Sequence, residues 1–363
     1  MLLSETKRLA NRLLTNAVAG FAALALMSGG VASEPGEFVD GVLQPLADGF
    51  PERPITIVVV DDPGSRDGIY ARSLQESLRG ISPVDILVSD EPASSLGNFP
   101  AYHDIQENRE GGTEGYYPVV STTVGITMGL LIDPIEEELG MGLDDFNIIL
   151  TTEFIPYVMI QRKDAPWGNS FEKWVEYAKA NPEKLTYISN EVGTGTDIFM
   201  EWVMDLSGIT GVQKIPATDQ HAAATAVAAG EGDFSLLVGD VALTHWEAGR
   251  VDVLLVSGGK VPPPWNEHPE IVSAEGYGFP VAPWGVPLGL STGKKVPPSH
   301  VEWLGKLFKA AAETDHHRRR QETYRIMTME TVDGKTANEL KERAYEYADP
   351  LIRKLGMHKD DNK

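Results

Sequence analysis

The chain has 363 residues and a formal net charge of −22, because 53 acidic side chains outnumber 31 basic ones. A surface this acidic repels nucleic acid and anionic lipid headgroups, so we expect no nucleic-acid partner. The sequence has no cysteine, which excludes disulfides, thiolate metal sites and a lipid-modified cysteine.

The first 33 residues have the pattern of a secretion signal. Three basic side chains precede an apolar run over residues 17–27, and small residues follow as far as Ser33. The apolar run is about half of the ~20 residues that a membrane-spanning helix needs. We therefore expect a signal peptide over 1–33, cleaved after Ser33, and a soluble mature protein in the periplasm.

The rest of the chain predicts two domains, since one compact core rarely exceeds about 250–300 residues. A β-branched run over 55–60 predicts a buried strand, bounded by Pro54 and by a turn over 61–64. An amphipathic helix over 69–78 follows, and then a strand over 84–88. Strand, helix and strand at this spacing are typical of a βαβ unit in a parallel sheet.

The middle of the chain predicts the crossing between the two domains. Residues 91–115 are rich in Gly, Asn, Glu and Ser without a clear period, so we expect mainly loop there. An apolar strand then ends in Ser121-Thr122-Thr123. Two further strands are expected on either side of Pro156, over 146–150 and 157–160, and the chain enters the second domain there.

The second domain is expected to repeat the arrangement of strand, turn and helix. Capping-box spacing at 169–172 begins a helix whose apolar stripe includes Trp174. A strand over 185–188 leads to the turn Gly193–Thr196, and a helix with Ile198, Trp202, Val203 and Leu206 on one face follows. The remaining predicted elements are a helix over 221–229, strands over 234–238, 251–256 and 286–290, and helices over 299–314 and 336–354.

Three segments of the chain carry a family pattern. The first is 50–59, with Pro63-Gly64 and Ala71-Arg72 behind it. The second is 171–187, followed by a Gly-x-Gly-Ser/Thr turn at Gly193–Thr196. The third runs from Ile215-Pro216 to Asp233, with Ala223, Thr225 and Ala229-Gly230 between them. In this order the segments resemble the solute receptors of tripartite tricarboxylate transporters, also called Bug proteins, although residues 91–140 match poorly.

The resemblance implies a periplasmic-binding-protein fold, type II-like, with two α/β lobes joined by two crossover strands. Residues 34–153 and 283–363 would form lobe 1, and residues 154–282 would form lobe 2. The family implies a monomeric receptor without metal, cofactor or catalysis. Such a receptor captures a small organic acid in the interlobe cleft and delivers it to membrane permease subunits. Backbone amides and hydroxyls of two loops, one from each lobe, hold the carboxylate in the family.

The turn Gly193–Thr196 has the chemistry of an anion site. A glycine-rich turn that begins a helix leaves backbone N–H groups unpaired and points the positive end of the helix dipole outward. Gly193 and Gly195 permit close approach of the backbone, and Thr194 and Thr196 add hydroxyl donors. The alternative is an ordinary helix cap, in which a threonine satisfies its own helix.

The loop Pro63-Gly64-Ser65-Arg66-Asp67 departs from the family's Pro-Gly-Gly-Gly/Ser-Thr pattern. Arg66 replaces a glycine, and it either clamps a ligand carboxylate or forms a salt bridge to Asp61, Asp62 or Asp67. Together with Asp197, these carboxylates oppose anion binding by ~1 kcal/mol or more each when partly desolvated. A simple tricarboxylate is therefore disfavoured, and a monocarboxylate with an amine or hydroxyl tail is favoured.

Three further positions complete the candidate site. The resemblance places Ser121 and Thr122 at a strand end where the family has ligand-facing hydroxyls, and Trp284 in the family's Trp-x-Gly region. A buried tryptophan is more often core than ligand wall. The candidate ligand-binding residues are Pro63, Gly64, Ser65, Arg66, Asp67, Ser121, Thr122, Gly193, Thr194, Gly195, Thr196, Asp197 and Trp284.

The sequence motifs of common enzymes are missing. There is no Gly-x-Ser-x-Gly elbow, His-Glu-x-x-His pair, Walker loop or Gly-x-Gly-x-x-Gly turn after a strand. The run over 316–320 is interpreted as a solvated helix face rather than a metal site. Two alternatives stay open: an exported hydrolase or isomerase with Asp197 as base, and a receptor that presents its ligand to a sensor protein.

Overall fold

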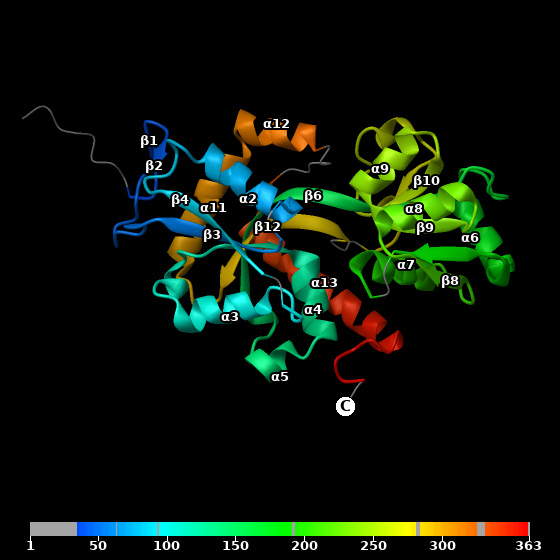
Figure 1. Ribbon diagram of the computed structural model, residues 1–363, viewed down its shortest axis with the longest axis horizontal. Coiled ribbons are helices and arrows are strands. Elements are labelled where there is room, and N and C mark those ends of the chain that lie inside the picture. Colours follow the sequence, from blue (N-terminus) through cyan, green and yellow to red (C-terminus); the bar gives the residue numbers. More distant parts are fainter. Residues whose placement is uncertain are drawn as a thin grey trace, which may run out of the picture.

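The computed structural model describes residues 35–62, 64–92, 94–190, 193–280, 284–324 and 331–361. The expected signal peptide, residues 1–33, lies outside the described residues. The chain forms a mixed α/β structure in which two lobes flank a central pair of strands (Figure 1). The expected class, two α/β lobes joined by crossover strands, is confirmed.

Lobe 1 begins with the hairpin of β1 (Phe38–Val39) and β2 (Val42–Leu43) and continues with the expected βαβ unit. Helix α2 (Arg66–Ser77) connects β3 (Ile55–Val60) to β4 (Ile86–Glu91), and the two strands are parallel. β5 (Val119–Thr122) joins the other side of β3, again in parallel. The carboxyl ends of the three strands therefore share one edge of the sheet, where ligands bind in open α/β sheets.

The expectation of mainly loop over 91–115 is wrong, because this region contains helix α3 (Phe99–Asn108). Phe99, Tyr102 and Ile105 recur every three residues and bury one face of the helix. The helix starts without a side-chain cap, and its apolar stripe of three residues is too short to stand out from the polar sequence around it. Helices α4 (Thr123–Ile132) and α5 (Ile135–Leu139) follow β5.

The two strands expected around Pro156 are one continuous strand, β6 (Phe146–Arg162). Its first part, up to Pro156, pairs with the antiparallel strand β12 (Gly285–Gly293). From Tyr157 onward it pairs with β9 (Phe234–Val238) on one side and β10 (Val251–Val256) on the other. Pro156 is tolerated because it stands where the partner strand changes. The expected domain boundary at 153/154 stays a prediction, and the pairing changes three residues later.

Lobe 2 extends the sheet beyond β6. The described strands form one path in the order β4-β3-β5-β12-β6-β9-β7-β8, with β10, β11 and β13 attached beside it. The elements of lobe 2 not yet given are α6 (Phe171–Ala180), β7 (Thr186–Ser189), α7 (Gly195–Leu206), β8 (Gln213–Pro216), α8 (Gln220–Ala229), α9 (Gly239–Glu247), β11 (Val272–Ser273) and α10 (Ala274–Tyr277). Short 3-10 turns lie at Gly112–Glu114, Leu143–Asp145, Pro182–Lys184 and Trp265–Glu267.

The apolar stripes expected on two helices of lobe 2 have different outcomes. On α6, Phe171, Trp174, Val175 and Ala178 are all buried, as predicted. The cap lies one residue later than the predicted box over 169–172, because Ser170 Oγ accepts from Lys173 N. On α7, the predicted stripe is wrong at its last member, because Leu206 is 44% exposed. Helix α9 was not anticipated between β9 and β10.

The C-terminal region folds back onto lobe 1 with α11 (Pro298–Ala312), α12 (Asp315–Thr323), β13 (Val332–Asp333) and α13 (Gly334–Lys354). The interpretation of 316–320 as a solvated face is wrong for two of its members. His317 is fully buried and Arg320 is 8% exposed. Both contact the buried carboxylate of Glu153 on β6, with His317 Nε2 3.2 Å from Glu153 Oε1.

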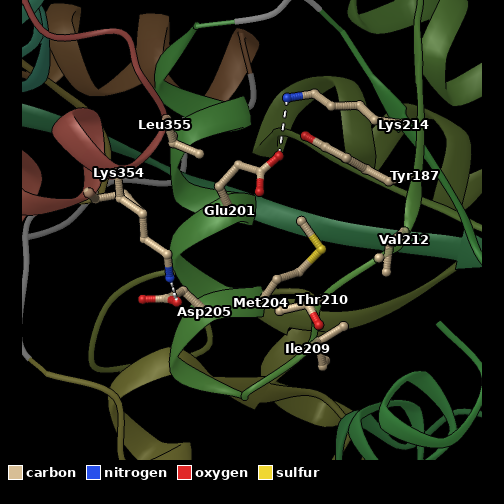
Figure 2. A pocket seen from close by; sticks show the side chains of 12 residues that line it. Tyr187, Glu201, Met204, Asp205, Ile209, Thr210, Val212, Lys214, Lys354 and Leu355 are labelled. Atoms are coloured by element: carbon tan, nitrogen blue, oxygen red, sulfur yellow. Dashed lines mark hydrogen bonds and ion pairs between the residues drawn. The ribbon is translucent and has the colours of Figure 1, made fainter. Parts of the chain in front are cut away.

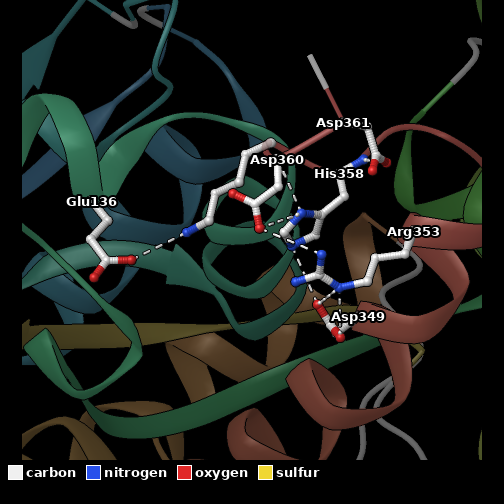
Figure 3. A network of polar contacts seen from close by, with 7 residues as sticks. Glu136, Asp349, Arg353, His358, Asp360 and Asp361 are labelled. Atoms are coloured by element: carbon white, nitrogen blue, oxygen red, sulfur yellow. Dashed lines mark hydrogen bonds and ion pairs between the residues drawn. The ribbon is translucent and has the colours of Figure 1, made fainter. Parts of the chain in front are cut away.

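Helix α13 connects the two lobes. Leu351 and Ile352 on α13 belong to the same hydrophobic cluster as Val124 on α4 and Phe199 on α7. The residues after α13 are held by ion pairs among Asp349, Arg353, His358 and Asp360 (Figure 3). Within the described part of the chain, no helix is both long and apolar enough to cross a membrane.

The buried pair of Glu153 and Arg320 generates a stability prediction. Arg320→Ala should lower the free energy of unfolding by about 3–5 kcal/mol, because it leaves the Glu153 carboxylate buried without its guanidinium partner. Arg319→Ala, which removes an exposed neighbour on the same helix, should change it by less than about 0.5 kcal/mol. Urea unfolding of the two variants measures the difference, and equal losses would contradict the structural role of Arg320.

Candidate functional site

A cavity of about 420 Å³ lies between the lobes at the carboxyl end of β3. Lobe 2 contributes Gly193, and the rest of the lining comes from lobe 1. The lobe 1 residues are Val60 of β3, Leu96, Gly97, Asn98 and Phe99 at the start of α3, and Gly125, Met128, Gly129, Ile132 and Asp133 along α4. Interlobe position at a sheet's carboxyl edge makes this cavity the candidate ligand site.

Asp197 organises the glycine-rich turn from within. Its buried carboxylate accepts hydrogen bonds from Ser189 Oγ at 2.9 Å and from the backbone N–H of Gly193 at 3.0 Å. Lys214 Nζ lies 2.6 Å from Oδ1 and 2.7 Å from Oδ2 of the same carboxylate. Asp197 therefore has a full set of partners within the chain and fixes the shape of the turn.

The two threonine hydroxyls of the turn are bonded to each other. Thr196 donates to Asn190 Oδ1 at 2.7 Å, and the oxygens of Thr194 and Thr196 lie 3.1 Å apart. In this arrangement both hydroxyl hydrogens are used inside the loop. The side chain of Thr194, the N-cap residue of α7, caps none of the helix's own N–H groups. The first turn of α7 therefore offers backbone N–H groups, rather than hydroxyls, to an anion.

The N-terminus of α7 abuts the N-terminus of α4. A Cβ atom placed on Gly195 would lie 3.2 Å from a methyl group of Val124 on α4 and 2.3 Å from the hydroxyl of Tyr157 on β6. A larger side chain would therefore displace the turn from both elements. Gly193 has φ of +87° and Met357 packs against it, so glycine is required there as well.

The other predicted loop caps its own helix and reaches across to lobe 2. Ser65 Oγ accepts from Gly68 N at 3.1 Å, and Gly64 has φ of +91°. Arg66 Nη2 lies 2.7 Å from Asp240 Oδ2 at the start of α9. Asp240 is 174 residues away in sequence and belongs to lobe 2. Arg66 thus forms an interlobe ion pair, where the sequence suggested a ligand clamp or a local partner; Pro63 lies outside the described residues.

Asp67, in the first turn of α2, has an unusual carboxyl group. The pKa of Asp67 is raised to about 6, mainly by burial and also by the neighbouring Asp61 and Glu153, and this value includes the opposing effects of Arg66 and Arg320. The group thus changes charge near pH 6. In its neutral form it opposes an anion in the cleft less than in its charged form.

The remaining candidates, Ser121, Thr122 and Trp284, make contacts within the protein. Thr122 Oγ1 accepts from Gly125 N at 2.9 Å and so caps α4. Ser121 is buried, 2.7 Å from Ser291 Oγ, which also bonds to Tyr102. Trp284 is 3% exposed, and its ring centroid lies 5.5 Å from that of Phe199. These three positions support the walls of the site, and a direct ligand contact from them stays a prediction.

Two other cavities lie away from the carboxyl end of β3, although the smaller one also joins lobe 2 to α13. One of about 580 Å³ lies within lobe 1, among β6, α11 and the start of α13, and includes Lys306 and Asn338. Another of about 230 Å³ lies beside α7, where Lys214 pairs with Glu201 and Lys354 pairs with Asp205 (Figure 2). The cations of this second cavity already have carboxylate partners. In the described ranges, no group of three His, Asp or Glu side chains is arranged to hold a metal ion.

Fold and cavity together define a two-lobed solute-binding protein. The profile of the tripartite tricarboxylate transporter family receptors matches residues 120–357. The chain belongs to this family, and the resemblance seen in the sequence is confirmed. It is a receptor family rather than an enzyme family.

Two curated relatives each share about a quarter of their aligned residues with this chain. A UPF0065 protein of Bordetella pertussis is 26% identical over 208 residues, which cover 57% of this chain and 61% of that protein. A UPF0065 protein from the gbd 5′ region of Cupriavidus necator is 26% identical over 325 residues, covering 87% of this chain and 91% of that protein. The match thus spans less than two thirds of the first relative and nearly all of the second.

Solved structures share the fold. A TctC solute-binding protein from Polaromonas superimposes with a TM-score of 0.72 at 18% identity, covering 84% of this chain and 99% of the other. Rpa4515 of R. palustris with adipate gives 0.60 at 19% identity, over 85% and 98% of the chains. MatC from Rhodopseudomonas palustris with bound malate gives 0.57 at 16% identity, over 84% and 100%.

The Asp67 carboxyl predicts a pH-dependent stability. Its pKa is about 6 in the folded protein and 3.8 in the unfolded reference, so between pH 4 and 6 the unfolded chain releases a proton that the folded chain keeps. This group therefore lowers stability as pH rises through that window, and the penalty is absent below about pH 4.

Replacing this carboxyl by an amide should remove the penalty. Asp67→Asn should gain more stability relative to wild type at pH 7 than at pH 4. The gain at pH 7 should be about 1–3 kcal/mol larger, and the melting temperature should rise accordingly. Melts of both proteins at the two pH values measure it. A difference that is constant or that shrinks toward pH 7 would contradict a raised pKa.

Proposed function

We propose that this protein is a periplasmic receptor that captures a small carboxylate-bearing organic acid between its lobes. It delivers the acid to the membrane permease subunits of a tripartite transporter and catalyses no reaction. The observation that carries the proposal is the N-terminus of α7, which adjoins the interlobe cavity and is not capped by the side chain of Thr194. Backbone N–H groups and the positive helix end suit one carboxylate there.

The relatives support this ligand class. The solved structures of the same fold with adipate and with malate both hold dicarboxylates. Membership of a transporter receptor family supports the permease partner and the periplasmic location, with residues 1–33 as the exported leader. The net charge of −22 supports solubility and disfavours binding to nucleic acid.

The hydrolase or isomerase alternative would need a free base beside the turn. Asp197 was its candidate, yet this carboxylate is buried and accepts from Ser189, Gly193 and Lys214. These three donors already occupy the buried carboxylate, so it does not face a substrate. This arrangement supports a structural role for Asp197 and favours binding over catalysis.

The proposed function is tested by a thermal-shift screen of the mature protein against mono- and dicarboxylates. An acid present at 100 times its dissociation constant should stabilise the fold by ~2.7 kcal/mol. Isothermal titration with the best acid should then give one site per chain. A full panel of organic acids without a shift would contradict the proposed function.

The interlobe ion pair gives a prediction that separates its possible roles. If Arg66 and Asp240 close the cleft together, Arg66→Gln and Asp240→Asn should each weaken ligand binding about two- to fivefold, and the double variant should lose little more. Stability should fall by no more than about 1 kcal/mol, because both side chains are about one-third exposed. Titration calorimetry and melts measure the two effects.

The ligand-clamp role predicts a different pattern. Asp240→Asn would free the guanidinium for the anion and strengthen binding, while Arg66→Gln would weaken it tenfold or more. Arg79→Gln is the matched control, because it breaks an ion pair with Glu76 on the same helix, within lobe 1. Tighter ligand binding by the Asp240→Asn variant would contradict the closure role.

A further inference from the structure

Asp133 is a charged side chain in the cavity lining without a partner. It follows the last turn of α4, where its backbone N–H donates to Gly129 O at 2.8 Å. Its carboxylate forms no hydrogen bond or ion pair with the described residues. Burial raises the pKa of this carboxyl above its usual range, which reflects the cost of desolvating an uncompensated charge.

In the part of the chain that the structure describes, no cation neutralises Asp133. Arg66 pairs with Asp240, and Arg72 with Asp90. Lys359, whose backbone N–H donates to Leu131 O, places its ammonium 3.4 Å from Glu136 instead. Among the described lining residues, none is basic, so a second carboxylate at this end of the cavity would face Asp133 unscreened.

From this arrangement we infer that the natural ligand carries a positively charged group that pairs with Asp133. The inference rests on the proposed function, because the opposite end of the ligand must be the carboxylate that α7 binds. Contact between Val124 and Gly195 places the α7 N-terminus at the Gly125 end of the cavity, and Asp133 lies at the other end of the same helix. The ligand is a zwitterion rather than a dicarboxylate.

The length of α4 sets the separation of the two charges. Gly125 and Asp133 are eight residues apart, which corresponds to about 12 Å along a helix axis. Hydrogen bonds of about 2.8 Å at each end leave about 6–7 Å between the two charged groups of the ligand, a distance that about three methylene groups span when extended and about five span when bent. The sides of the cavity between them are apolar, formed by Val60, Met128 and Ile132, and suit such a chain.

Three acids of matched chain length test the inference. In 6-aminohexanoate, hexanoate and adipate, the distal group is an ammonium, a methyl and a carboxylate. Isothermal titration of the mature wild-type protein at pH 7 should rank them in that order, with 6-aminohexanoate about tenfold or more tighter than hexanoate. Asp133→Asn should remove this preference and leave the affinity for hexanoate within about twofold.

Controls separate this inference from the proposed function. Asp133→Asn should melt at or above the wild-type temperature, since the carboxylate has no partner to lose. The exposed Asp85 lies at the start of β4, the opposite end of the sheet, and Asp85→Asn should keep the full preference. Equal affinity for 6-aminohexanoate and hexanoate, or tighter adipate, would overturn the inference while the receptor function stands. Failure of a broad organic-acid panel would overturn both.

Discussion

The strand shared by the two lobes is the constraint on which the rest of the structure depends. β6 has 17 residues and spans about 55 Å at the usual rise per residue, long enough to serve both sheets. Its first part pairs with β12, and its second part pairs with β9 and β10. Because the hydrogen-bonded ladder continues through Pro156, the two lobes share one strand and stay joined at this crossing. The cavity lies beside this crossing, where small changes in lobe angle alter its width.

Recognition in this cleft depends on backbone dipoles more than on charged side chains. The N-termini of α4 and α7 meet at Val124 and Gly195, and Asp197 with Lys214 holds the turn before α7 in place. Arg66, the cation that the sequence placed at the site, is engaged with Asp240. An anion therefore meets oriented N–H groups at one end of the cavity and the carboxylate of Asp133 at the other. Such a field favours a ligand with opposite charges at its two ends.

Sequence periodicity predicts the elements whose apolar residues face one core. It does not predict contacts that depend on how the two lobes are arranged. The stripe of Phe171, Trp174 and Ala178 identifies α6 without any tertiary information. The turn at Gly193–Thr196 is also predicted from the sequence, because glycines between a strand pattern and an apolar helical stripe indicate a turn. No local pattern connects Arg66 to Asp240 or Glu153 to Arg320, since these contacts exist only once the chain has crossed between lobes. The sequence does not single out Asp133, because no local pattern shows that an aspartate after an apolar helix lines a cavity.

The central claim is that a ligand carboxylate binds at the N-terminus of α7 in the interlobe cleft. A crystal structure of the mature protein with the organic acid that stabilises it most tests this claim directly. The account predicts carboxylate oxygens within about 2.7–3.2 Å of the backbone nitrogens of Gly195 and Thr196. A ligand seated in the lobe 1 cavity beside Lys306, or held in the cleft by the guanidinium of Arg66 alone, would contradict it.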